Sequence, residues 1–208
     1  MEMRWISSVA PVCMRAFFVV AAITSLSGCV ISPSSDEMSF VAPPMQWDHR
    51  PEGQEWTEST LVALSTKDSI LSERVPGDIE TWCPAYAESP IESRRAFWAG
   101  LMSAVARYES TWNPAASGGG GRWIGLMQIS PRSATNYGCE ATSVRALKDG
   151  EANLECAVDI MSTQVAKDGL VAGGGNRGIG RDWAPLRSSE KRAAMASWTS
   201  EQPYCQAG

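Results

Sequence analysis

The feature that most constrains the fold is a run of apolar residues at helical spacing between Pro90 and Tyr108. Its members are Phe97, Trp98, Leu101, Met102, Val105 and Tyr108. Recurrence at three and four residues predicts an amphipathic helix with one buried stripe. The row continues by four residues to Glu109, so a carboxyl group is expected at the helix end on the face that should be apolar. Burial there favours the protonated acid, which can protonate a glycosidic oxygen; the competing interpretation is a frayed helix end with a solvated glutamate.

Residues with strong local preferences bound this helix. Ser89 and Glu92 match a Ser-x-x-Glu capping box, with Pro90 at the first helical position. Asn113-Pro114 is expected to end the helix, because the residue before a proline is disfavoured in helical conformation. Ser117 and the glycines at 118–121 then predict a flexible loop, which suits either a linker or the lip of a substrate groove.

A single uncharged amide lies among apolar residues in the segment Gly125-Leu126-Met127-Gln128-Ile129. Gln128 offers both a donor and an acceptor, which is what holding a sugar hydroxyl or an acetamido group requires. Ser130-Pro131 follows and predicts the start of another helix, with serine as the cap and proline at the first helical position.

Two motifs in this order, ESTWNP from Glu109 and GLMQISPRSA from Gly125 to Ala134, resemble the signature of the soluble lytic murein transglycosylases. The similarity spans about residues 82 to 185 and implies a mostly α, lysozyme-like (goose-type) domain that binds peptidoglycan glycan strands. By matching position, the resemblance implies that Glu109 is the sole catalytic acid/base and that Gln128 lines the groove. Further substrate-binding or supporting positions are expected at Met127, Ser110, Asn113, Ser117, Ser130, Tyr137 and Asn176.

Glycoside hydrolases ordinarily use two carboxyl groups, and a partner for Glu109 is not evident. Asp149 and Glu151 look like helix-start residues, and Asp159 and Asp168 like solvated helix faces; the remaining candidates are Glu140 and Glu155. The resemblance implies a reaction without water, in which the muramic acid C6 hydroxyl closes a 1,6-anhydro ring on cleavage of the MurNAc-GlcNAc β-1,4 bond. Two alternatives stay open: a hydrolytic muramidase of the goose-lysozyme type, and a catalytically weak peptidoglycan-binding lipoprotein.

One departure from the family pattern concerns a tyrosine that in relatives sits near the catalytic glutamate. The matching stretch here is Gly174-Gly175-Asn176-Arg177-Gly178, which places Gly175 at the tyrosine position. Either another side chain, such as Tyr137 or Trp183, fills that space, or the transition state is stabilised less. A smaller departure is Ser130, where relatives often have methionine.

Other chemistries find little support in the sequence. His49 is the only histidine, which argues against a Ser-His-Asp or Cys-His centre and against a zinc site. The glycine runs at 118–121 and 173–175 lack the Lys-Ser/Thr of a phosphate-binding loop. With a net charge of -5 and no basic cluster in the sequence, nucleic acid is not an expected partner. No metal or cofactor is expected.

The amino terminus predicts export and a lipid anchor. Arg4 and Arg15 precede an apolar run at 16–26, and Leu26-Ser27-Gly28-Cys29 resembles the lipobox of bacterial lipoproteins. The run is short for a bilayer span, so residues 1–28 are expected to form a cleaved signal peptide, with lipid on Cys29. Val30 follows in place of an aspartate, which favours the outer membrane facing the periplasm. A cell-wall or secretion assembly is a further partner class, and a secreted protein with an incidental Cys29 is the competing interpretation.

Cysteine content agrees with an oxidising compartment. Beyond Cys13 and Cys29, four cysteines remain, which predicts two disulfides with three possible connectivities. We favour Cys139–Cys156, which closes the segment between two helices, and Cys83–Cys205, which ties the two ends of the domain. Four buried free thiols are the alternative.

Composition suggests how the chain is organised. Residues 29–78 are expected to form a tether, because they are rich in serine and proline up to about residue 58. A short helix is expected within this segment at 61–75. Trp47 and Trp56 are unusual in a pure tether. The catalytic domain is then expected at 79–208. It should hold further helices at 151–167, with Gly169 as the stop, and around 188–198, and no strand pattern is apparent.

Overall fold

The computed structural model describes residues 42–206 and shows a mostly helical fold, as the sequence predicts. Its α-helices are α1 (Gly53–Ser65), α2 (Ile91–Ser110), α3 (Pro131–Tyr137), α4 (Gly150–Asp168) and α5 (Ser189–Ser200). Strands β1 (Ser117–Gly118) and β2 (Trp123–Ile124) form a small antiparallel hairpin that the sequence did not suggest. Short 3-10 helices lie at Ile79–Thr81, Tyr86–Glu88, Ala146–Lys148, Gly173–Gly175, Gly178–Arg181, Ala184–Arg187 and Pro203–Cys205. Within this part of the chain, no helix has the length and apolar character needed to cross a membrane.

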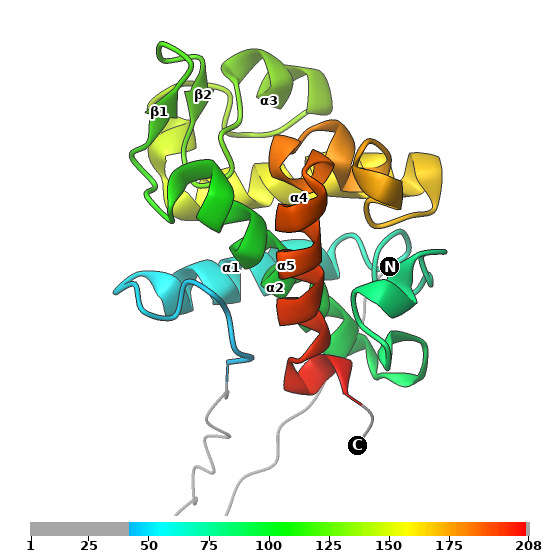
Figure 1. Cartoon of the computed structure of the whole chain (residues 1–208). Helices are drawn as coiled ribbons and strands as arrows, with labels where there is room; N and C mark the ends of the chain where they lie inside the picture. Colours follow the sequence, from blue (N-terminus) through cyan, green and yellow to red (C-terminus); the bar gives the residue numbers. More distant parts are fainter. Residues whose placement is uncertain (1–41, 207–208) are drawn as a thin grey trace, which may run out of the picture. The chain divides into compact units, whose positions relative to one another are not determined.

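Helix α2 is the centre of the core. Every residue from Ala96 to Ala106 is buried, and the row Phe97, Leu101, Val105 is fully so, which confirms the stripe expected from the spacing. Helices α1 and α5 both pack against α2, and α4 packs against α1 (Figure 1). The last turn of α2, which carries Glu109, extends towards the hairpin.

Both ends of α2 differ from the sequence prediction. The capping box does not form: Pro90 is the N-cap, and the hydroxyl of Ser89 donates to the carbonyl of Ala85 instead of capping the helix. The helix ends at Ser110, ahead of Asn113, because Thr111 and Trp112 take left-handed backbone angles. Their N–H groups bond back to the carbonyls of Arg107 and Ala106, which closes the helix end.

Residues 42–78 belong to the compact domain, so the tether expected over 29–78 and the boundary at 79 are wrong for this stretch. Trp47 and Leu64 are fully buried, and the Trp47 indole N–H donates to the Thr57 hydroxyl at 2.8 Å. The backbone N–H of Gln46 also bonds to Ser103 on α2. The helix expected at 61–75 lies instead at Gly53–Ser65. The signal peptide expected at 1–28 and the lipid-bearing Cys29 lie outside the described residues.

Two disulfides, Cys83–Cys205 and Cys139–Cys156, have the expected pairing. The first joins the segment before α2 to the C-terminal end of the described chain. Close by, the Tyr204 hydroxyl donates to the Pro44 carbonyl at 3.3 Å, so the two ends of the described chain lie together. Figure 1 shows these ends at the bottom of the view and the hairpin and α3 at the top.

Later helices agree closely with the sequence. The side chains of Ser130, Asp149 and Ser188 accept hydrogen bonds from backbone N–H groups at the starts of α3, α4 and α5. Gly169 ends α4 in the left-handed conformation. These short-range signals place each helix to within one or two residues.

Candidate active site

Glu109 lies in the last turn of α2 with a half-buried side chain. Within residues 42–206, its carboxyl group has no hydrogen-bond donor and no ion pair. Burial raises the pKa of Glu109 to about 7, although the positive charges of Lys191 and Arg187 pull in the opposite direction. The group therefore holds its proton in a large fraction of molecules near neutrality, as a general acid must.

Left-handed backbone angles occur just after this acid in the chain and again at Gln128. Among the described residues, the non-glycine positions with positive φ are Thr111 (53°), Trp112 (54°) and Gln128 (48°). Such conformations cost free energy and are concentrated at functional sites in proteins. The indole N–H of Trp112 donates to the carbonyl of Ser103 at 2.9 Å, which holds the turn after Glu109 against α2.

Gln128 lies against the hairpin. Its side-chain amide donates to the carbonyl of Gly125 at 2.9 Å. A Cβ on Gly118 would lie 2.4 Å from Gln128 Oε1, so the glycine in β1 leaves space for this amide. The same loop holds Ser117, which is exposed. Gln128 retains free acceptor capacity at Oε1 for a ligand donor.

Asn153 on α4 fixes the segment before Gln128, and the sequence reasoning missed it. Its side chain is fully buried, accepts from the N–H of Met127 at 2.8 Å and donates to the carbonyls of Ile124 and Leu147 at 3.0 and 2.9 Å. Gly125 must be a glycine, because a Cβ there would lie 2.2 Å from the Leu147 carbonyl oxygen and φ is 80°. A lone asparagine in a helix gives no signal of such a role in the sequence.

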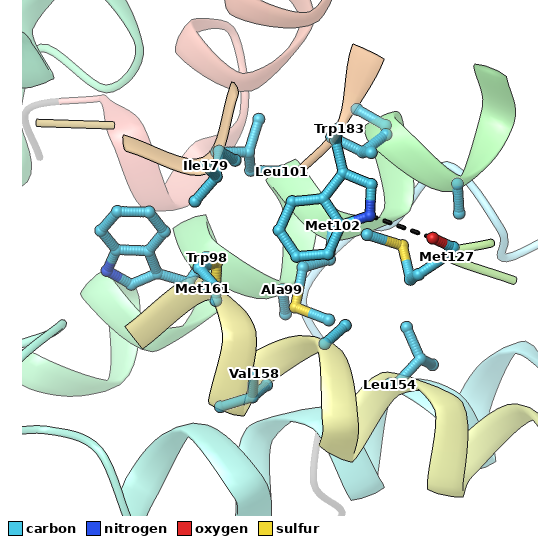
Figure 2. Close-up of a cluster of buried hydrophobic side chains, with 14 of the residues drawn as sticks. Trp98, Ala99, Leu101, Met102, Met127, Leu154, Val158, Met161, Ile179 and Trp183 are labelled. Carbon is cyan, nitrogen blue, oxygen red and sulfur yellow. Dashed lines mark hydrogen bonds between the residues drawn. The ribbon is translucent and has the colours of Figure 1, made fainter. Parts of the chain in front are cut away.

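Met127 does not face a ligand, which corrects the expectation of substrate contact. Its side chain is 1% exposed and packs in the core with Met102 and Leu154 (Figure 2). The indole N–H of Trp183 donates to the Met127 carbonyl at 3.0 Å, drawn as a dashed line in Figure 2. Trp183 therefore holds the backbone of the segment that precedes Gln128.

The remaining polar positions have mostly local roles. Ser110 donates to the Ala106 carbonyl, Asn113 accepts from the N–H of Ala115, and Ser130 caps α3. The Tyr137 hydroxyl donates to Asp182, 3.1 Å from the nearer oxygen. Asn176 is exposed in the turn after Gly175. Their contact with substrate stays a prediction.

Gly175 has no room for the tyrosine of the family pattern. Its φ is 110°, and a Cβ there would lie 2.3 Å from the carbonyl oxygen of Leu186 and 2.6 Å from the guanidinium of Arg192. The backbone in this turn is thus built around glycine, and a side chain at this position would have to displace the segment before α5.

No second carboxylate is available along the hairpin. The stretch 110–139 contains neither aspartate nor glutamate. Asp149 caps α4, as expected, and Asp159 pairs with Lys67 at 2.8 Å. Asp168 was expected on a solvated face, but its side chain is only 7% exposed because it binds Arg181 and the N–H of Gly178.

Four surface cavities over residues 42–206 have volumes between 240 and 740 Å³, and Glu109 lines none of them. These four cavities are thus not the site of a Glu109 ligand. In the same part of the chain, no group of three or more His, Cys, Asp or Glu residues is placed to hold a metal ion.

Comparison with known proteins identifies the family. Residues 89–197, more than half of the chain, match the profile of the transglycosylase SLT domain. The chain belongs to the transglycosylase SLT domain family. This family comprises peptidoglycan lytic transglycosylases, so the SLT domain described here is of the type that acts on peptidoglycan.

Solved structures similar to this SLT domain include three of Bd0314 DslA: a glutamate-to-glutamine mutant, the wild-type protein in a second form, and another glutamate-to-glutamine mutant. Their TM-scores are 0.72, 0.71 and 0.70, each at 28% sequence identity, covering 79% of this chain and 99% of that chain. No curated protein matches the sequence significantly. The SLT domain thus has the lysozyme-like fold that the motifs implied.

Asn153 provides a stability test of the SLT domain. Asn153→Ala leaves the Met127 N–H and the Leu147 carbonyl without the partner that Asn153 supplies, whereas the Ile124 carbonyl keeps its bond from the Ile129 N–H. We therefore expect unfolding to become easier by about 3 kcal/mol. We also expect weaker strand binding, because the segment that carries Gln128 loses its anchor on α4. Chemical denaturation measures the first effect. Thr163→Ala, an exposed change on the same helix, should shift stability by less than about 0.5 kcal/mol; equal losses in the two variants would contradict the assigned role.

The pKa of Glu109 also predicts how stability depends on pH. A carboxyl group whose pKa is raised on folding, here to about 7 from an ordinary 4.5, keeps its proton in the folded state after the unfolded chain has lost it. Stability is therefore lost as pH rises between these values. Since one pKa unit is worth about 1.4 kcal/mol and the side chain is partly exposed, we expect Glu109→Gln to gain about 2 kcal/mol over the wild type at pH 8 and nothing at pH 4. A difference that is the same at both pH values would refute this.

Proposed function

We propose that this SLT domain cleaves the MurNAc-GlcNAc β-1,4 bond of peptidoglycan without water, producing 1,6-anhydro-MurNAc, with Glu109 as the single general acid/base. The observation that carries the proposal is a half-buried acid at the end of α2 whose pKa is raised to about 7. The absence of any carboxyl group from residues 110–139, which include the hairpin, supports a mechanism with one acid.

Both steps of the reaction use the same carboxyl group. Protonated Glu109 donates to the glycosidic oxygen, the bond from that oxygen to C1 of MurNAc breaks, and GlcNAc leaves with a restored hydroxyl. The C6 hydroxyl of the same MurNAc then bonds to C1 and passes its proton to the Glu109 carboxylate, which regenerates the acid. Lys191 and Arg187 stabilise the carboxylate between the two steps. Gln128 holds a hydroxyl or acetamido group of the bound sugar in this proposal, which its side-chain donor and acceptor support.

Hydrolysis of the same bond needs a base that activates water, usually a second carboxylate several ångströms away. Three of the candidate carboxylates already have partners: Asp149 caps α4, Asp159 pairs with Lys67, and Asp168 pairs with Arg181. The chemistry that requires only Glu109 therefore fits the chain better. A binder without activity would gain nothing from an acid held near neutrality, and so the raised pKa favours an enzyme.

Product analysis in water enriched in heavy oxygen tests this proposal. Digested glycan strands are separated and weighed by mass spectrometry. We expect anhydro ends that contain no heavy oxygen. Reducing ends that carry heavy oxygen would instead identify a hydrolytic muramidase of the goose-lysozyme type, and uncut strands that remain bound would identify a peptidoglycan-binding protein.

We also propose that lipid on Cys29 anchors the protein to the outer membrane, facing the periplasm. The Leu26-Ser27-Gly28-Cys29 motif after a short apolar run supports this. Labelled palmitate should be incorporated into the wild type and not into Cys29→Ala, and membrane fractionation should separate the two proteins. Equal labelling would disprove the anchor.

A further inference from the structure

Positive charge gathers around Glu109 in a chain whose net charge is -5. Arg107 and Tyr108 lie with Glu109 in the last turn of α2, and Lys191 lies in the first turn of α5. The Tyr108 ring centroid is 5.6 Å from the Arg107 guanidinium carbon and 5.3 Å from Lys191 Nζ. Arg187, just before α5, is close enough with Lys191 to act on the charge of the Glu109 carboxyl. Lys191 and Arg187 therefore act on the acid from the start of α5, and Arg107 shares the Tyr108 ring with Lys191.

Among the described residues, these cations have no acidic partner within 4 Å. Over residues 42–206, ion pairs within 4 Å involve Arg50, Lys67, Arg95 and Arg181 only. Glu190 is next to Lys191 on α5, is exposed and makes no ion pair with it. The side chains of Arg107 and Lys191 make no hydrogen bond within the described chain. Their charge is thus free to bind a ligand anion.

Arg187 differs from the other two because it is held in place. Its guanidinium donates to the carbonyl of Gly180 at 3.0 Å and to that of Arg181. Carbonyl groups leave the positive charge uncompensated, and a fixed guanidinium loses little conformational freedom when it binds an anion. The hairpin and α3 add Arg122 and Arg132, while Asp182, which is bonded to Tyr137 of α3, contributes one negative charge.

We propose that Arg107, Arg187 and Lys191 form a carboxylate-binding flank of the active site that recognises the acidic substituent of the muramic sugar. The inference rests on the proposed function, because it concerns the same site and the same strand. GlcNAc is neutral, whereas MurNAc carries either a free lactyl carboxylate or a peptide stem with carboxylates. A cationic flank beside Glu109 therefore sets which sugar lies on that side of the acid and hence which bond is cut.

Binding measurements with the full chain carrying Glu109→Gln test the flank without cleavage. The probes are soluble glycan strands with peptide stems and strands stripped of peptide by an amidase, each before and after conversion of their carboxylates to amides. We expect Lys191→Gln to weaken binding to carboxylate strands about threefold, and Arg107→Gln with Lys191→Gln about tenfold, with less effect at high salt. Lys167→Gln, an exposed lysine on α4, serves as the matched control and should change nothing.

The amidated strands decide the outcome. We expect the variants and their parent to bind these neutral strands equally, and the form of untreated strand that shows the larger loss identifies the lactyl or the stem carboxylate as the ligand. Equal weakening on amidated and untreated strands, or no weakening on either untreated form, would overturn the proposal. Vesicles with phosphate headgroups serve as a further probe. If the substitutions weaken binding to these vesicles and not to the strands, the ligand is a lipid headgroup and the proposal is overturned.

Kinetics on the otherwise unchanged protein separate this proposal from the proposed function. Lys191→Gln should raise KM on carboxylate strands about threefold and move the upper pH limit of activity to higher pH, because removal of a positive charge raises the pKa of Glu109. A merely structural defect would not shift the pH profile upward. If the unsubstituted protein cuts no strand while binding still depends on Lys191, the proposed function fails and the flank stands. If the protein cuts strands and Lys191→Gln changes neither KM nor the pH profile, the proposed function stands and the cationic flank fails.

Discussion

Replacement of Glu109 by glutamine should lower the rate of peptidoglycan cleavage by at least about a thousandfold. Glutamine has nearly the same size and can remain in the half-buried position, but it has no acidic proton to give and no carboxylate to take one back. Both proton transfers of the reaction pass through this group, so both are lost together. Release of soluble muropeptides from purified peptidoglycan measures the rate, and the circular dichroism spectrum checks that the fold is retained.

Glu140→Gln is the matched control for this experiment. Glu140 is the next acid along the chain after Glu109, and it is exposed. We expect its replacement to leave the rate within about twofold of the wild type, as is usual for exposed side chains outside a site. A Glu109→Gln protein that clears peptidoglycan as fast as the Glu140→Gln protein would end the catalytic assignment.

Removal of the Cys83–Cys205 disulfide should cost about 5 kcal/mol of unfolding free energy. The two cysteines are 122 residues apart in sequence, so the bond closes most of the domain into one loop and removes many unfolded conformations. Both are fully buried, and the bond lies beside the hydrogen bond from Thr199 to the Trp82 carbonyl that also ties α5 to the segment before α2. Denaturation of the Cys83→Ala/Cys205→Ala protein measures the loss.

The shorter disulfide supplies the comparison. Cys139 and Cys156 are 17 residues apart, so Cys139→Ala/Cys156→Ala should cost about 3 kcal/mol, less than the first pair. This order follows from loop length. The reverse order, with the shorter loop more costly, would show that loop closure does not account for the stabilisation.

The parts of the fold that the sequence predicts are those with strong local signals. The row from Phe97 to Glu109 repeats every four residues, and Ser130, Asp149 and Ser188 are side-chain caps next to helical patterns. In these cases the contacts that fix an element lie within a few residues of it. The position of Glu109 on a buried stripe could therefore be inferred before any coordinates.

The failures concern residues whose partners are distant in sequence. Trp47 and Trp56 are isolated aromatics in a proline-rich stretch without periodicity, and their burial becomes apparent only once α1 packs on α2 and α4. Asn153 looks like any polar residue of α4, yet its three bonds reach 6 to 29 residues away. The lack of space at Gly175 likewise depends on Leu186 and Arg192, which no local pattern relates to it. Tertiary contacts decide all three.

The most direct measurement of the central claim is the titration of Glu109 itself by NMR, with carboxyl-labelled glutamate and with assignment by the signal missing from Glu109→Gln. We expect a midpoint at about 7, because burial at the end of α2 raises the pKa of Glu109. A midpoint near the ordinary glutamate value of 4.5 would mean that Glu109 is a solvated carboxylate at neutral pH and would contradict the mechanism.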